Sequence, residues 1–227
     1  MTLVRRLLTP TGVVAFVAVA AVVGVGLFVV PPDRLQGQVQ RIMYVHVPSA
    51  WIAYLAFFVT FVASVRYLWR KDLGADRLAA SSAEVGLVFT GVAIVTGAIW
   101  GKATWGVWWD WDPRLTTTAL LFLIYAGYVL VRASLIDRLG RARAGAIIGI
   151  VGFANVPIVH FSVLWWRSLH QPPTIIRPGD PSIDHLLLAE LLASVLAFTV
   201  LFLYLLGRRL DLERGRDELD QALVVTS

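Results

Sequence analysis

Four histidines are the side chains in this sequence best suited to bind a metal or a metal-containing cofactor: His46, His160, His170 and His185. The chain has no cysteine, which excludes a disulfide framework, a cysteine-based zinc site, an iron–sulfur cluster and a thiol nucleophile. Any metal chemistry must therefore use histidine, methionine, tyrosine, carboxylates or the metal of a cofactor. The sequence also has no serine-elbow, metalloprotease or phosphate-loop motif, so we do not expect a turnover enzyme, and a partner would have to hydrolyse any ATP.

The strongest local signal is a tryptophan-rich stretch at residues 100–116, here called the tryptophan segment. It holds five of the nine tryptophans with charged residues among them: Trp100, Trp105, Trp108, Trp109, Trp111, Asp110, Asp112 and Arg114. Indole rings stack on flat molecules and arginine pairs with carboxylates, so this mixture suits a large, flat, partly anionic ligand. Haem fits this description, and a quinone or a peptide also fits. Gly106 and Pro113 indicate a loop with a defined shape.

The elements that must position these residues are predicted to be membrane-spanning helices. Of the 227 residues, 58% are hydrophobic and 15% are charged, and the mean hydropathy of +0.72 lies far outside the range of soluble domains. Six apolar runs, each long enough to cross ~30 Å of hydrocarbon, predict an all-α integral membrane bundle of six transmembrane helices. The runs lie at about 12–30, 45–65, 84–101, 116–133, 144–166 and 185–206. We expect one membrane domain at residues 1–207 and a charged tail at 208–227.

The basic residues predict the orientation of the bundle. The net charge of +5 could suggest nucleic acid, but most basic residues flank apolar runs, so we read them as topology signals and expect no nucleic-acid binding. Of the 20 lysines and arginines, all but six fall on one side; the six are Arg34, Arg41, Lys102, Arg114, Arg167 and Arg177. The positive-inside rule then places both termini in the cytoplasm and the tryptophan segment outside, between the third and fourth helices. The first apolar run is too long for a secretory signal, so we expect an uncleaved first span.

An interfacial aromatic belt is the simplest alternative explanation of the tryptophans. Such a belt populates both membrane interfaces. On the predicted topology, eight of the nine tryptophans lie toward the outer side, including Trp51, Trp165 and Trp166, and only Trp69 lies inside. A generic belt does not explain this distribution.

Four sequence blocks carry a resemblance to a known family. The pattern Trp105-Gly106-x-x-Trp109-x-Trp111-Asp112-x-Arg114-Leu115-Thr116 resembles the WWD signature of proteins that handle haem in cytochrome c maturation. The chain is most similar to the haem exporter protein C family (CcmC). The other blocks are residues 41–48, with His46, residues 156–166, with His160, and residues 168–171, with His170. Pro113 departs from the family, which often has a small residue there, whereas related WWD synthases carry Trp-Asp-Pro.

The resemblance implies a function that composition and spacing do not show. It implies haem b bound at the outer face of the bacterial inner membrane, with axial histidines from the two loops that flank the tryptophan segment. It also implies delivery of haem to the periplasmic haem chaperone CcmE, in a complex with the transporter subunits CcmA and CcmB and the small protein CcmD. The expected partners are therefore haem, these proteins and membrane lipid.

Two histidines on the same side of the membrane could serve as axial ligands. His46 lies at the predicted outer mouth of the second span, within a block that matches the family. The fifth helix should end soon after Trp166, because Pro172 and Pro173 cannot continue a span, and this places His170 at loop level with the tryptophans. His160 would lie deeper, where a polar contact between helices is the simpler reading. We therefore predict His46 and His170 as the iron ligands, with His160 as the alternative and His185 a distant third.

Charged residues near these sites have two readings each. Arg41 and Arg114 are candidates to bind haem propionates or the receiving partner, or they are ordinary interface charges. Asp112 belongs to the predicted haem site, and a structural salt bridge to Arg114 is its alternative role. Glu84 and Glu190 fall in or near spans, where ionisable groups are costly and often functional, although each could reach water at its own side.

Two other functions stay open on the sequence alone. A WWD-type cytochrome c haem synthase would attach haem directly to an apocytochrome, but such synthases resemble larger assemblies with more spans and histidines. A non-haem subunit would use the tryptophan segment only to dock a partner.

Overall fold

The computed structural model describes residues 9–171 and 183–226, with side chains up to residue 216. Arg5, Arg6 and Arg177, which contributed to the predicted orientation, lie outside these residues. The regular elements of the described residues are α2 (Pro10–Phe28), the short 3-10 helix η1 (Gln38–Ile42), α3 (Met43–Arg70), α4 (Leu73–Trp105), α5 (Pro113–Ser134), α6 (Arg138–Phe153), α7 (Asn155–Trp165) and α8 (His185–Thr226). The predicted all-helical architecture is confirmed.

Six helical stretches of the described chain are long and apolar enough to cross a membrane, as the apolar runs predicted. They are Pro10–Phe28, Gln38–Arg70, Leu73–Trp105, Pro113–Ser134, Arg138–Trp165 and His185–Arg216. Several extend past the apolar runs, because a helix satisfies its own backbone and can continue into the polar headgroup region. The 33 residues of α4 span about 50 Å at 1.5 Å per residue, well beyond ~30 Å of hydrocarbon.

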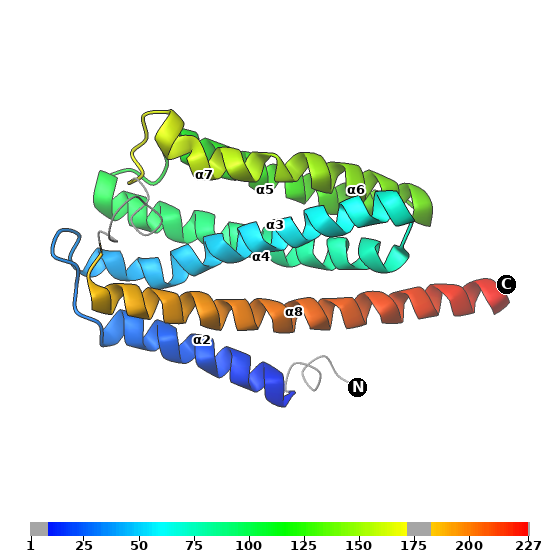
Figure 1. Cartoon of the computed structure of the whole chain (residues 1–227), viewed down its shortest axis with the longest axis horizontal. Helices are drawn as coiled ribbons and strands as arrows, with labels where there is room; N and C mark the ends of the chain where they lie inside the picture. The colour runs from blue at the N-terminus through cyan, green and yellow to red at the C-terminus, as the bar shows by residue number, and fades with distance from the viewer. Residues whose placement is uncertain (1–8, 172–182, 227) are drawn as a thin grey trace.

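The helices form three layers that run roughly along one axis (Figure 1). The hairpin of α3 and α4 is the middle layer, α5 with α6 and α7 covers one side, and α8 with α2 covers the other. At the α3–α4 turn, Lys71 adopts a left-handed conformation with φ of 55°. Asp72 then caps α4 by accepting a hydrogen bond from the Gly74 amide at 2.8 Å. This tight turn makes the two central helices antiparallel neighbours.

The middle of the bundle is held by close contacts among α3, α4 and α5. Phe57 of α3 stacks on Tyr125 of α5 with ring centroids 3.6 Å apart. A Cβ atom at Gly86 of α4 would lie only 2.8 Å from the Phe57 ring, so glycine is required for the approach of α4. These contacts fix the α3–α4 hairpin. The end of the hairpin away from the turn at 71–72 carries His46 and the tryptophan segment.

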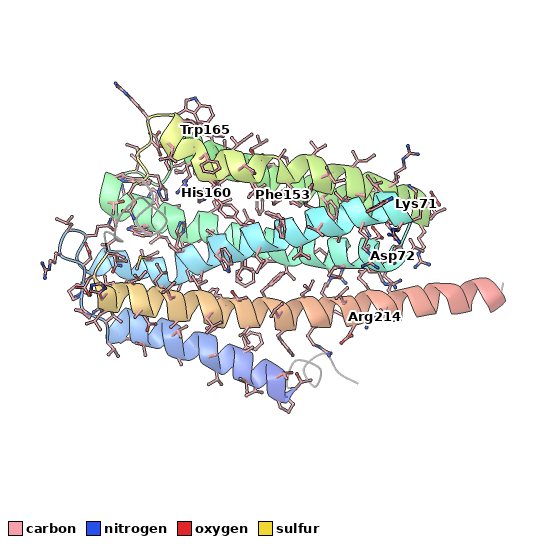
Figure 2. All side chains as sticks on the ribbon, viewed as in Figure 1. Lys71, Asp72, Phe153, His160, Trp165 and Arg214 are labelled. Carbon is pink, nitrogen blue, oxygen red and sulfur yellow. The ribbon has the colours of Figure 1, made fainter. Side chains whose placement is uncertain are left out.

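The fifth span is not the single helix that the apolar run at 144–166 predicted. It begins earlier, at Arg138, and is interrupted at Ala154 between α6 and α7. Proline at position 157 has no N–H to donate to the carbonyl of Phe153, which opens the helical ladder there. The Asn155 side chain donates to the Thr117 carbonyl of α5 at 2.8 Å and ties the interruption to its neighbour. In Figure 2 the labelled Phe153 ends α6, and His160 lies on α7 beyond the break.

The last helix continues without interruption through the predicted boundary at residue 207, so the start of the charged tail is an extension of α8. Within this extension Arg209 pairs with Glu84 of α4, with Nη2 donating to Oε1 at 2.8 Å. Arg209 also pairs with Glu213 one turn later, at 2.7 Å. Glu84 therefore links α4 to α8.

Replacing Glu84 with glutamine is expected to reduce the stability of the bundle by about 1 kcal/mol, because Arg209 loses one anionic partner but keeps Glu213. Denaturant unfolding in detergent measures this change. Asp211→Asn is the matched control, since Asp211 forms an exposed pair with Arg208 at 3.1 Å and its loss should cost less than about 0.5 kcal/mol. Equal losses in the two variants would contradict an interhelical role for Glu84.

Candidate functional site

The three longer connections of the bundle meet at one end, here called the tryptophan end (Figure 1). It is formed by residues 29–42, 106–112 and 166–171 together with the start of α8. The opposite end holds the short connections at 71–72 and 135–137 and the C-terminal part of α8. The side of the bundle that the basic residues predicted to face outward is thus one continuous end.

The tryptophan segment is more helical than the predicted loop at 100–116. The helix α4 continues through Trp105, so only residues 106–112 form the connection to α5. Gly106 ends α4 with a φ of 80°, a left-handed conformation that favours glycine. Pro113 starts α5, where its fixed φ suits the first helical position. The two residues that indicated a shaped loop therefore define its boundaries.

His46 lies half-buried near the start of α3, against the last turns of α4. Its Nδ1 atom lies 3.1 Å from the hydroxyl oxygen of Thr96. That hydroxyl donates its proton to the carbonyl of Val92 at 2.7 Å, so it accepts from a protonated His46 Nδ1. This tautomer leaves the lone pair of Nε2 free.

Two residues of α4 shape the space around the His46 imidazole. A Cβ atom at Gly97 would lie 2.9 Å from Cε1 of His46, so glycine allows the ring to approach α4. The ring meets Trp100 edge to face, with centroids 5.7 Å apart. The indole N–H of Trp100 in turn donates to the Gln36 side chain at 3.0 Å. Sequence reasoning missed Thr96 and Gly97, whose only signal is a polar and a small residue in an apolar helix.

His170 lies half-buried in the connection after α7. It is far from His46 in the chain but close enough in the fold to act on it electrostatically. Its ring meets Trp105 with centroids 6.1 Å apart, and its Nδ1 lies 3.4 Å from the Gln171 carbonyl. Nη1 of Arg114 lies 3.5 Å from the same Nδ1, so this nitrogen has both an acceptor and a donor beside it. Burial lowers the pKa of His170 to about 4, with the positive charge of Arg114 adding to the effect, so the imidazole is neutral at physiological pH.

Arg114 connects the segments that carry His160 and His170. Its Nη2 donates to the carbonyl of His160 at 2.8 Å, and its Nη1 lies 3.5 Å from Nδ1 of His170. The guanidinium thus holds the end of α7 and the segment after it against the start of α5. Its buried Nε has no hydrogen-bond partner in the described part of the chain.

Asp112 joins the two loops of the tryptophan end. It is 4% exposed, and its two carboxylate oxygens accept from the Arg114 amide at 2.8 Å and the Leu169 amide at 2.6 Å. The first bond caps α5, and the second fixes the backbone one residue before His170. The structure thus engages Asp112 with backbone amides rather than with the Arg114 side chain.

The remaining tryptophans form an exposed aromatic surface. Trp111 and Trp108 are 80% and 59% exposed, and Trp109 meets Trp111 edge to face at 5.8 Å. A hollow of about 300 Å³ lies beside them, between residues 110–113 and residues 167–169. Trp165 and Trp166 are also exposed at this end, while Trp69 lies at the opposite end, next to the last residue of α3.

The other predicted site residues have different contacts. The His160 ring on α7 meets Tyr54 at 6.4 Å and Phe161 at 5.0 Å. His185 is exposed at the first position of α8. The Arg41 guanidinium donates to the carbonyls of Leu27 and Val30, so it caps α2 instead of lying against the exposed tryptophans.

The fold and this site define a multi-pass helical membrane protein that presents two half-buried histidines and an aromatic surface at one end. The family model described as Heme exporter protein C (CcmC) matches residues 1–224, and the chain belongs to this family.

Curated relatives agree with the family. A Heme exporter protein C of Bradyrhizobium diazoefficiens is 40% identical over 220 residues, which cover 93% of this chain and 83% of the relative. The Heme exporter protein C of Escherichia coli strain K12 is 38% identical over 172 residues, 75% of this chain and 69% of the relative. A cytochrome c biosynthesis ccmC-like mitochondrial protein of Marchantia polymorpha is 38% identical over 160 residues, 70% of this chain and 68% of the relative. The family places the chain in haem export and cytochrome c maturation.

Proposed function

We propose that this protein binds haem b at the tryptophan end, with His46 and His170 as the two axial ligands of the iron, and passes the haem to a partner. The observation that carries the proposal is that both imidazoles are held at one end of the bundle by polar groups at Nδ1. Nδ1 of His46 lies at Thr96 Oγ1, and Nδ1 of His170 lies near both the Gln171 carbonyl and the Arg114 guanidinium. Metal-bound histidines typically have a hydrogen-bond partner at their second nitrogen, which fixes the ring and its tautomer.

The donor set fits haem better than a bare metal ion. In the described residues no group of three or more histidine, aspartate or glutamate side chains lies together as a protein-only metal site requires. Haem iron already has four ring nitrogens and needs only two further ligands, which the pair of histidines supplies. The His160 ring faces Tyr54 and has no comparable polar partner among residues 9–171 and 183–216, which supports His170 as the second ligand.

The aromatic and charged residues around the histidines have separate roles in this proposal. Trp100 packs against His46 and Trp105 packs against His170. The exposed rings of Trp108 and Trp111 and the half-buried ring of Trp109 offer faces for the flat macrocycle. Arg114 acts electrostatically on both imidazoles and is suited to a haem propionate. Asp112 and Arg41 act by holding the loops and α2 in place.

The exposed position of the site favours transfer over storage. Trp111 protrudes from the end of the bundle, so a partner could contact the outer edge of a bound haem. We propose that the tryptophan end faces the periplasm of a bacterial inner membrane, with both termini cytoplasmic. The receiving partner is then a CcmE-type haem chaperone, and subunits of the CcmA, CcmB and CcmD types complete the complex. ATP hydrolysis, where it occurs, belongs to a partner subunit.

The proposal predicts that the purified wild-type protein carries non-covalent haem b. A pyridine haemochrome assay and the Soret absorption of the detergent-solubilised protein measure this directly. Absence of haem after expression with abundant haem would instead support a docking subunit that binds no haem. Covalent attachment of haem to a co-expressed apocytochrome without any chaperone would support the synthase reading.

A further inference from the structure

A turn in the connection between α2 and η1 presents the side chain of Gln36 to the tryptophan end. Oδ1 of Asp33 accepts from the amides of Leu35 and Gln36, each at 2.9 Å. The Gly37 amide donates to the Asp33 carbonyl at 3.0 Å, and Gly37 has a φ of 59°, a left-handed conformation that favours glycine. Because aspartate and glycine close the turn at its two ends, the backbone of Gln36 has a fixed place.

The side-chain amide of Gln36 forms hydrogen bonds to two different segments. Its Oε1 accepts from the indole N–H of Trp100 on α4 at 3.0 Å. An indole N–H can only donate, so it fixes the orientation of the Gln36 amide. Nε2 of Gln36 then donates to Oε1 of Gln171, in the segment after α7, at 3.3 Å. One side chain from the connection at 29–42 therefore joins the end of α4 to residues 166–171.

Each of these two partners contacts one of the proposed axial ligands. Trp100 meets the His46 ring edge to face, with centroids 5.7 Å apart. The Gln171 carbonyl lies 3.4 Å from Nδ1 of His170. Gln36 is thus linked to both imidazoles through one intermediate residue on each side. Two histidines bind one haem iron together only if their separation is fixed, and a side chain that joins their supports is placed to fix it.

The chemistry of the two partners requires an amide at this position. The Trp100 indole needs an acceptor and Oε1 of Gln171 needs a donor, both at the end of one side chain. A carboxylate accepts but does not donate, and an ammonium group donates but does not accept. The amide of Gln36 supplies both groups on adjacent atoms, so a substitution can remove one contact and keep the other.

We propose that Gln36 is a positioning residue of the haem site, which fixes the half that carries Trp100 and His46 relative to the half that carries Gln171 and His170. The inference rests on the proposed function, since it gives Gln36 a role in the geometry of the iron ligands. Gln36 acts through its two hydrogen-bond partners and not on the iron. Loss of either hydrogen bond should therefore loosen the separation of the two ligands without removing a ligand.

Gln36→Glu breaks one of the two hydrogen bonds selectively in the full-length protein in detergent. The carboxylate still accepts from Trp100, but it has no N–H to donate to Gln171. Gln38→Glu is the matched control, because it adds the same charge two residues later, on an exposed side chain at the first position of η1. Hydrogen–deuterium exchange, which needs no bound haem, should become about fivefold faster in the peptide that contains Gln171, the change expected for one hydrogen bond of ordinary strength. Exchange in Gln38→Glu should match the wild type.

The rate of haem loss reports on the geometry of the ligands. Transfer of haem to excess apomyoglobin should be about fivefold faster from Gln36→Glu than from the wild-type protein. The Soret band should keep its position, because both histidines remain. The double variant Gln36→Glu/Gln171→Lys restores a donor opposite the carboxylate, and both rates should return to within about twofold of the wild type. A general loss of structure at position 36 would not be reversed by this second change.

Two results would overturn the proposal directly: equal exchange in Gln36→Glu and Gln38→Glu, or a double variant that does not recover. Faster exchange with an unchanged rate of haem loss would also overturn it, since Gln36 would then join the two segments without positioning the ligands. If the wild-type protein carries no haem, the proposed function fails. The exchange measurement and its reversal in the double variant then decide by themselves whether Gln36 holds the two segments together.

Discussion

Alanine at His46 or at His170 is expected to abolish stable haem binding by the purified protein. Each substitution removes one of the two proposed axial ligands, and loss of a ligand should cost more than the roughly tenfold affinity loss typical of the outer partners that merely orient ligands. Haem content by pyridine haemochrome and the position of the Soret band measure the effect. Added imidazole is expected to restore part of the spectrum, because it can occupy the vacated axial position.

The other two histidines are the controls for this experiment. His160→Ala should retain haem, because Arg114 binds the backbone carbonyl of His160, which alanine keeps, and the imidazole contacts only aromatic rings in the described residues. His185→Ala removes an exposed imidazole at the same end of the bundle and should also retain haem. An unchanged spectrum for His170→Ala beside a lost one for His160→Ala would show that the second ligand had been assigned to the wrong histidine.

The six spans could be predicted from the sequence because hydrocarbon imposes one simple condition, a long apolar run, on every crossing helix. The limits of the helices could not be predicted in the same way. α4 begins eleven residues before its predicted apolar run because Asp72 caps it and its polar first turns still form helix. The interruption at Ala154 escaped prediction because the run at 144–166 is apolar on average, and hydropathy does not register the missing N–H of Pro157.

The sequence predicted which residue types form the candidate site, but it did not predict their hydrogen-bond partners. Histidines and tryptophans are rare enough to identify from composition and spacing, and Gly106 and Pro113 indicated a shaped loop. The loop was predicted at 100–116, however, and the structure limits it to residues 106–112. The roles of Arg41 and Asp112 could not be predicted from the sequence. Both side chains bind backbone groups, which every residue has, so no particular residue type indicates the partner. The pairing of His46 with Thr96 joins residues 50 positions apart and depends on the register of α3 against α4, which no local pattern encodes.

Asp112→Asn is expected to release the segment that carries His170, although the side chain keeps its size. Both carboxylate oxygens of Asp112 accept from backbone amides, one from Arg114 and one from Leu169. Asparagine has one acceptor oxygen, so its amide N–H₂ must face one of these two N–H groups. The lost charge-assisted bond is worth about 2 kcal/mol, which corresponds to a roughly 30-fold faster hydrogen exchange at whichever amide is released. The bond from the Arg114 amide caps α5, and keeping it preserves the helix. We therefore expect the Leu169 amide to lose its hydrogen bond.

Hydrogen–deuterium exchange of the peptide that contains Leu169 and His170, followed by mass spectrometry, measures this release. Haem content should fall in the same variant, because a freed His170 is no longer held near His46. Asp110→Asn is the matched control: it makes the same change of charge two residues earlier, on an exposed side chain beside the same hollow. If hydrogen exchange at Leu169 is the same in the two variants, the carboxylate of Asp112 acts only through its charge.

If Asp112→Asn alone exposes the Leu169 amide yet keeps its haem, the position of His170 does not depend on the hydrogen bond from the Leu169 amide to Asp112. The role of His170 as an axial ligand would then have to be reconsidered. Faster exchange and haem loss together would show that a buried aspartate, with no contact to either imidazole, holds the second ligand in place.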